Sequence, residues 1–292
     1  AIVGGNANTI CNGEQYAFIG GGRNHIVDGD CSTIAGGAYN CITANAAIIA
    51  GGTKNTGSGA CGFIGGGCGN TITDELSVIG GGKANYVTSG SSVIGGGCDN
   101  CISGIYDFIG GGKLNCILNA KCSVVVGGEQ NRISGSASSR YHFLGGGFIN
   151  RICVTDAAQA NPTVSTLVGG FNNCISVGGA TIVGGTSNTN SGYEGFIGGG
   201  NAHAVSGCYI SVVAGRLNCV SGCCSAIVNG CRNCVTANFT SIVGGIQNTG
   251  SGACGFIGGG CSNNVAGVYG IIGGGYNHEI CTGEGCSAIL GG

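Results

Sequence analysis

The sequence predicts an all-β fold, a parallel β-solenoid or β-roll in which a repeat of about 15 residues forms one coil. Three observations predict it. An aliphatic residue followed by glycines recurs along the chain, mostly at intervals of 15, and a second aliphatic position follows it eight residues later. The string NTGSGACGFIGGGC occurs twice, at residues 55–68 and 248–261. Two aliphatic positions eight apart cannot by themselves hold a helix face at period 3.6, but they suit two short strands joined by tight turns.

The repeat accounts for the whole chain, so we expect a single domain over residues 1–292 with about 19 coils. Its consensus is x-Ile-Gly/Val-Gly-Gly-x-x-Asn-x-Ile/Val-x-Gly-x-x-Ser, and stacked coils should lie about 4.8 Å apart. The units start at residues 1, 18, 33, 48, 63, 78, 93, 108, 124, 143, 166, 181, 196, 211, 226, 241, 256, 271 and 288.

The second and tenth positions are expected to point inward, each in one short strand. The second is aliphatic in all nineteen units, and the tenth in fifteen of the eighteen complete ones. The tenth position departs from this pattern at Gly57, Asn190 and Gly250. Stacking of one aliphatic residue on the next would form the core, but a coil this thin buries little area against the entropy of ordering its backbone. We therefore expect partner surfaces or cross-links to add stability.

A corner is expected between the two strands, at Gly-Gly-x-x-Asn. The fifth position is always Gly, which indicates positive φ or a backbone approach too close for a Cβ. The eighth position is Asn or His, two residues that are enriched in the left-handed region and that hydrogen-bond nearby backbone. The corner residues include Asn8, His25, Asn40, Asn55, Asn70, His203 and His278.

Composition excludes several classes of protein. The chain is 42% apolar and only 8% charged, with a net charge of −2, which is unlike a disordered chain. Its 67 glycines come with a single proline and no strict triplet period, which excludes collagen. Without a basic excess we expect no nucleic-acid partner. No apolar run approaches the roughly 18 residues that a membrane-spanning helix needs, so we expect no membrane insertion.

The 21 cysteines fall at repeated positions of the unit. Cys101 and Cys116 share the ninth position of adjacent coils, as do Cys219 and Cys234, and stacked Cα atoms are within disulfide range. Disulfides would suit a thin extracellular rod. Two alternatives stay open, in which the cysteines serve as small buried apolar residues or as metal ligands. The candidate disulfide residues are Cys101, Cys116, Cys219, Cys234, Cys68 and Cys98.

We expect no metal site, cofactor or catalytic site. The C-x-x-C pairs at 98–101 and 231–234 lie eight coils apart, so four thiolates cannot meet in one straight rod. The Gly-Gly-Gly-Lys strings at 80–83 and 110–113 lack the Ser or Thr of a phosphate loop. The 22 charged residues are scattered over the units rather than gathered on one face.

Two long coils, within residues 124–165, carry the candidate binding insertion. Their units, 124–142 and 143–165, exceed the usual period, and solenoids often carry function in such insertions. We single out Arg140, Tyr141, His142 and Asp156 as candidate binding residues. The alternative is an insertion that the coil merely tolerates.

The segment SVIGGGKANYVTSG at residues 77–90 resembles the head repeats of trimeric autotransporter adhesins, and the resemblance extends over all units. It implies a left-handed parallel β-roll in a homotrimer, displayed on a surface. The repeats are also similar to Gly-rich repeats of phage and large-virus fibres. The chain opens at Ala1, lacks Met and closes on the start of a further unit, so we expect a fragment or a processed part of a longer chain.

Together these features predict a non-enzymatic, disulfide-stabilised fibre, extracellular or on a virion or cell surface, with adhesion as its role. Its partners would be copies of itself, as a homotrimer or an end-to-end polymer, and a host receptor or glycan. Three alternatives stay open: a virion fibre of a large DNA virus, a self-polymerising extracellular filament, and a metal- or redox-active cysteine-rich fibre.

Overall fold

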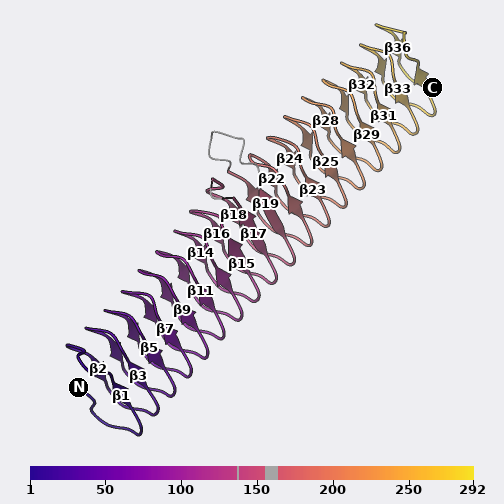
Figure 1. Ribbon diagram of the computed structural model, residues 1–292. Helices are drawn as coiled ribbons and strands as arrows, with labels where there is room; N and C mark the ends of the chain where they lie inside the picture. Colours follow the sequence, from indigo (N-terminus) through magenta and orange to yellow (C-terminus); the bar gives the residue numbers. More distant parts are fainter. Residues whose placement is uncertain (137, 155–163) are drawn as a thin grey trace. The chain divides into compact units, whose positions relative to one another are not determined.

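A computed structural model describes residues 1–136, 138–154 and 164–292 (Figure 1). The described residues are all-β, without a helix, and they divide into two compact units, Ala1–Gly147 and Phe148–Gly292. Each unit is a parallel β-solenoid with two short strands in every turn. The 36 described strands correspond to about 18 turns. The first repeat start, at Ala1, lacks an even-numbered strand, and its second-position residue Ile2 forms an isolated bridge to Ile19.

The strands pair with the equivalent strand of the next turn, mostly one repeat period further along the chain. Val78 is the register partner of Val93, and Tyr86 is the register partner of Cys101. The backbone N–H of Gly80 donates to the carbonyl of Ile94 at 2.9 Å, and this bond recurs from turn to turn. Most backbone polar groups are therefore satisfied by neighbouring turns rather than within a turn. Even-numbered strands hold the first and second repeat positions, and odd-numbered strands hold the ninth and tenth.

In the first unit the strands are nearly all two residues long. The even-numbered strands are β2 (Phe18–Ile19), β4 (Thr33–Ile34), β6 (Ile48–Ile49), β8 (Phe63–Ile64), β10 (Val78–Ile79), β12 (Val93–Ile94), β14 (Phe108–Ile109), β16 (Val124–Val125) and β18 (Phe143–Leu144). The odd-numbered strands are β1 (Thr9–Ile10), β3 (Ile26–Val27), β5 (Cys41–Ile42), β7 (Thr56–Gly57), β9 (Thr71–Ile72), β11 (Tyr86–Val87), β13 (Cys101–Ile102), β15 (Cys116–Leu118) and β17 (Arg132–Gly135).

The second unit repeats this pattern. Its even-numbered strands are β20 (Thr166–Leu167), β22 (Thr181–Ile182), β24 (Phe196–Ile197), β26 (Ser211–Val212), β28 (Ala226–Ile227), β30 (Ser241–Ile242), β32 (Phe256–Ile257), β34 (Ile271–Ile272) and β36 (Ala288–Ile289). Its odd-numbered strands are β19 (Arg151–Val154), β21 (Cys174–Ile175), β23 (Thr189–Asn190), β25 (Ala204–Val205), β27 (Cys219–Val220), β29 (Cys234–Val235), β31 (Thr249–Gly250), β33 (Asn264–Val265) and β35 (Glu279–Ile280).

The core of each unit consists of the aliphatic residues that the period predicts. Ile79 and Ile102, at the second and tenth positions, are fully buried, as are most of their equivalents, whereas Ile2, Ile10 and Ile289 near the chain ends are exposed or half-buried. Asn190 is the polar exception at the tenth position. Its Nδ2 donates to the carbonyls of Thr181 at 3.2 Å and Gly195 at 2.8 Å, so burial leaves the amide with partners.

The corners differ from the expectation in one respect. The left-handed residue is at the seventh position of the unit, one before the Asn, as at Asp99 (φ +56°) and even at Ile149 (φ +58°). A second left-handed position is the fourteenth, as at Cys61 (φ +57°). No eighth-position residue has positive φ in the described parts of the chain. Asn and His are therefore present for the hydrogen bonds of their side chains rather than for backbone conformation.

The fifth-position glycine is required for the reasons predicted. Gly82 has φ +92°, and a Cβ there would lie 2.7 Å from Nδ2 of Asn85 and 2.8 Å from the amide nitrogen of Gly97. Among the residues that the structure describes, no helix is long and apolar enough to cross a membrane.

Candidate functional site

The eighth-position residues form a buried asparagine ladder inside each unit. Nδ2 of Asn85 donates to the carbonyls of Gly81 at 3.0 Å and Gly97 at 3.1 Å. Its Oδ1 accepts the backbone N–H of Asn100 at 3.1 Å. Each amide thus ties its own corner to the next turn, in a buried environment where such bonds are most needed.

The predicted corner residues all belong to this ladder. Asn40, Asn55 and Asn70 are fully buried, whereas Asn8 and His278 near the chain ends are partly covered. A His at the eighth position makes only some of the hydrogen bonds that an Asn makes there. Nδ1 of His25 accepts the backbone N–H of Asn40 at 3.1 Å, but Nε2 of His25 is buried without a partner. Burial also lowers the pKa of His203, which favours its neutral form.

A second buried column, the serine column, contains the fifteenth-position residues. The Ser92 hydroxyl donates to the carbonyl of Gly104 at 2.9 Å and accepts the backbone N–H of Asp107 at 3.2 Å. The consensus Ser was visible in the sequence, but its inward direction was not. Other serines of the column include Ser32, Ser77, Ser123, Ser165 and Ser225.

Asp107 replaces serine in this column and is 2% exposed. Its Oδ1 accepts the backbone N–H of Ser123 at 2.8 Å, while Oδ2 is buried without a partner. Burial raises the pKa of Asp107 to about 7, with the hydrogen bond from Ser123 acting in the opposite direction. A Cβ at Gly104 would overlap both Oδ2 of Asp107 and the carbonyl oxygen of Ala120, so only glycine fits there. Sequence reasoning did not single out this carboxyl.

His142 also lies in the serine column, two turns after Asp107, and is 1% exposed. Neither ring nitrogen has a partner, and burial lowers the pKa of His142 to about 4. His142 therefore points into the coil rather than outward, and the binding insertion itself stays a prediction. Its neighbours Arg140 and Tyr141 are exposed, and Arg140 is the register partner of Lys121. Asp156, the remaining candidate of that set, lies outside the described residues.

Two pairs of ninth-position cysteines are brought together as predicted, and all four are thiols. Cys101 and Cys116 are register partners on β13 and β15, and Cys219 and Cys234 are partners on β27 and β29. A hydrogen bond from the neighbouring thiol lowers the pKa of Cys101 to about 7 and that of Cys219 to about 6. The same bond, with burial, raises the pKa of Cys116 and of Cys234. Each pair therefore holds one readily ionised thiol.

Two further observations concern the other candidate disulfide residues. Cys68 and Cys98 are not neighbours, because Lys83 occupies the sixth position of the turn between them. A disulfide instead joins Cys208 and Cys223, whose Cα atoms are 4.6 Å apart. Sequence reasoning missed this pair, although its sequence separation of 15 equals the repeat period.

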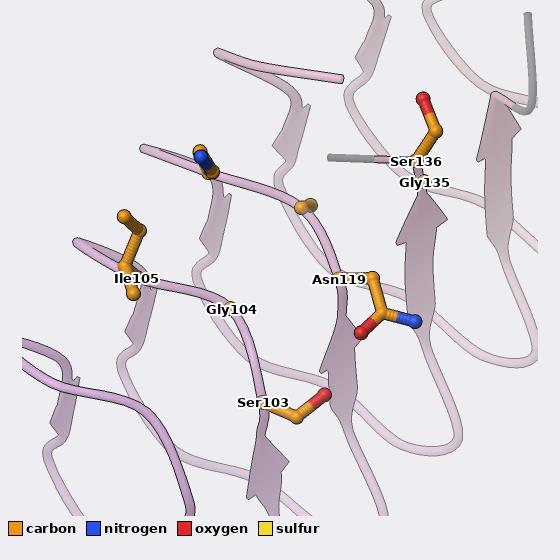
Figure 2. Close-up of a pocket in the computed structure, with 8 residues that line it drawn as sticks. Ser103, Gly104, Ile105, Asn119, Gly135 and Ser136 are labelled. Atoms are coloured by element: carbon orange, nitrogen blue, oxygen red, sulfur yellow. The ribbon is translucent and has the colours of Figure 1, made fainter. Parts of the chain in front are cut away.

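A surface pocket of about 330 Å³ opens beside the turn 108–123, which has one residue more than the usual unit (Figure 2). It spans three successive turns, and Figure 2 shows Ser103, Asn119 and Ser136 on different turns around it. Its lining offers hydroxyl, amide and ammonium groups beside one aliphatic side chain. The lining residues are Ser103, Gly104, Ile105, Asn119, Ala120, Lys121, Gly135 and Ser136.

Within the described ranges, no group of three or more His, Cys, Asp or Glu side chains is placed to hold a metal ion. The chemistry that the geometry does provide is thiol chemistry in pairs and hydrogen bonding in one pocket. Comparison with protein-family models finds no match to this chain, and a search of curated proteins finds no relative.

Proposed function

We propose that this chain is a non-enzymatic structural fibre protein of a cell or virion surface, with adhesion as its role. One observation supports it most: the buried asparagine ladder continues from turn to turn, as from Asn85 to Asn100, so that each turn stabilises the next. Stability then grows with the number of stacked turns rather than with the width of the core. That is a property of rods and fibres.

The wider assignment rests on the repeat pattern of the sequence. Copies of the chain, as a homotrimer or an end-to-end polymer, are its proposed partners, and a virion fibre of a large DNA virus is a variant of the same proposal.

For adhesion, the pocket beside Asn119 and Lys121 offers hydrogen-bond donors and acceptors suited to a glycan. Ser103→Trp would fill this pocket, whereas Ser251→Trp places the same side chain at the equivalent eleventh position elsewhere.

One experiment tests the structural role directly. The purified chain is imaged by electron microscopy and is treated with a broad-specificity protease, with and without reductant. We expect narrow particles that resist digestion when oxidised and lose part of that resistance when reduced. Rapid digestion under both conditions would overturn the proposal. The adhesive role would be supported by binding to a glycan array that Ser103→Trp abolishes and Ser251→Trp retains. Absence of any glycan binding would overturn the adhesive role.

A second function is favoured by the thiol pairs. Because Cys101 and Cys219 have lowered pKa values beside a second thiol, each pair is suited to reversible disulfide formation. In a redox-responsive fibre, an oxidant would convert each of these thiol pairs to a disulfide, and a reductant would restore the thiols. Reduction and reoxidation that change the protein's resistance to protease, with no change in mass other than the thiol hydrogens, would distinguish it from a permanently cross-linked fibre.

A further inference from the structure

The outward face of the even-numbered strands is free of charge. It consists of the first, third and fourth positions of each unit, and we call it the uncharged face. None of its positions holds Asp, Glu, Lys, Arg or His in the turns described, from Phe18 to Gly291. By contrast, the outward face of the odd-numbered strands carries charges, as at Arg132 on β17 and Glu279 on β35.

On the uncharged face, the sizes of the first- and third-position side chains mostly vary in opposite directions, which keeps the height of the face similar from turn to turn. Where the first residue is Phe, the third is Gly, and the ring lies over that glycine. A Cβ added at Gly20 would stand 3.4 Å from Cε1 of Phe18, and one at Gly198 would stand 3.3 Å from Cε1 of Phe196. Where the first residue is small or polar, the third is usually Val. Such turns hold Thr166 with Val168, Thr181 with Val183, Ser211 with Val213, Ala226 with Val228, and Ser241 with Val243.

This face leaves much apolar surface in water. Ile48 is 41% exposed and Val228 is 45% exposed, and most turns present one such side chain. With about 60 Å² of apolar area per turn, nine turns of one unit offer roughly 500 Å². Two copies would then bury about 1,000 Å² through one unit each, near the lower limit of a specific interface. Contiguous exposed apolar area of this size indicates an interaction surface.

We propose that the uncharged face packs against the same face of a second copy of this chain. The proposal rests on the proposed structural function and specifies its partner surface. The repeat favours a copy over another protein, because the face presents one apolar side chain per turn at intervals of about 4.8 Å. Only a partner with the same interval stays in register over several turns, and a second copy of the chain supplies that interval.

The cysteines beside this face fit the same partner. Cys31 and Cys61, in the turns that lead into β4 and β8, are exposed thiols. They lie two turns apart, about 9.6 Å, which exceeds the Cα separation of a disulfide. They cannot pair with each other, and Ala46 lies between them at the same position. Such thiols remain available for a second copy.

The test compares two double variants of the full chain in reducing buffer. Ile48→Glu with Val228→Glu places a charge on the uncharged face of each unit. Tyr86→Glu with Val268→Glu places the same charges elsewhere, at side chains that are 42% and 46% exposed. Sedimentation equilibrium measures self-association, and circular dichroism melting checks that each variant is folded.

We expect the unsubstituted chain and the control variant to self-associate, and the first variant to do so at least about tenfold more weakly. A monomeric unsubstituted chain, or equal weakening by both variants, would overturn the proposal. A monomer that still resists protease would leave the structural function standing, so the two failures can be told apart. For a variant that fails to fold, Ile48→Thr with Val228→Thr replaces it, since Thr already occurs on this face, at Thr33 and Thr166.

Discussion

Oδ1 of Asn70 accepts the backbone N–H of Asn85, one turn further along, at 3.0 Å. Both residues are fully buried, and the bond recurs between successive ladder residues of each unit. The contact is directional: the side chain of one turn fixes the backbone of the next. A change at one ladder position therefore affects two interfaces between turns, which makes the ladder a sensitive place to test the stability of the fold.

Asn85→Ala should destabilise the first unit by about 2–4 kcal/mol. The substitution removes the donors to the carbonyls of Gly81 and Gly97 and leaves the backbone N–H of Asn100 buried without its acceptor. Guanidinium unfolding followed by circular dichroism measures the change. The matched control is Thr73→Ala, at an exposed residue that directly follows β9, for which we expect less than about 0.5 kcal/mol. Equal effects of both substitutions would contradict the role of the ladder.

His25→Asn should stabilise the same unit by about 0.5–1 kcal/mol. The buried Nε2 of His25 has no partner, whereas an asparagine amide would reach the carbonyls of Gly21 and Gly37 as it does in neighbouring turns. The same guanidinium titration measures it. A loss of stability would show that the imidazole ring contributes packing that the ladder geometry does not reveal.

Asp107 and His142 should make the free energy of unfolding of the first unit depend on pH in opposite directions. The pKa of Asp107 is raised to about 7 from an ordinary 3.8, so its contribution is complete below about pH 4 and is lost as the pH rises through 7. The pKa of His142 is lowered to about 4 from an ordinary 6.5, so its contribution is complete above 6.5 and is lost as the pH falls. Between about pH 4 and 6.5 the two slopes oppose each other.

Single substitutions by serine, the usual residue of this column, separate the two effects. Asp107→Ser leaves His142, and the free energy of unfolding should rise with pH by up to about 1.4 kcal/mol per pH unit. His142→Ser leaves Asp107, and the free energy of unfolding should fall with pH at a similar rate. Urea unfolding from about pH 4 to 6.5 measures both slopes. Parallel slopes in the two variants would be incompatible with these buried groups.

Cys101 should react with iodoacetamide about tenfold faster than Cys41 at about pH 7. Both occupy the ninth position, but the thiol of Cys116 lowers the pKa of Cys101 to about 7, whereas burial raises the pKa of Cys41. Peptide mass mapping measures the rates. Cys116→Ala is the control, because it removes the hydrogen bond to the Cys101 thiol and should slow Cys101.

With oxidised glutathione, Cys101 and Cys116 should form a disulfide and release two glutathione thiols, whereas Cys68 and Cys98 should not join each other. A Cys68–Cys98 linkage in the mapped peptides would contradict the register of the turns.

Ile149→Asn should stabilise the second unit by about 1 kcal/mol. Ile149 has φ +58°, which is unfavourable for a β-branched residue, and asparagine tolerates this region better. The reverse exchange at the same repeat position, Asn172→Ile, should destabilise by a similar amount, since Asn172 has φ +54°. Thermal unfolding of both variants checks the pair. Changes of the same sign would show that backbone strain does not decide the effect.

The sequence alone determined the period, the two aliphatic columns and which cysteines lie on adjacent turns. Ile79 and Ile102 are buried as expected, and Cys101 lies beside Cys116. These follow from the residues because stacking at a fixed period places equal positions in contact, whatever the detailed shape of the coil.

The tertiary structure alone decided where the left-handed residues lie, which polar groups are inside, and which thiols are joined. Ile149 adopts positive φ against its own preference, and Asp107 and His142 lie in a column that serine usually fills. The physical reason is that hydrogen bonds to the next turn fix the backbone of each corner. That network outweighs the local preference of a residue and sets which way its side chain points.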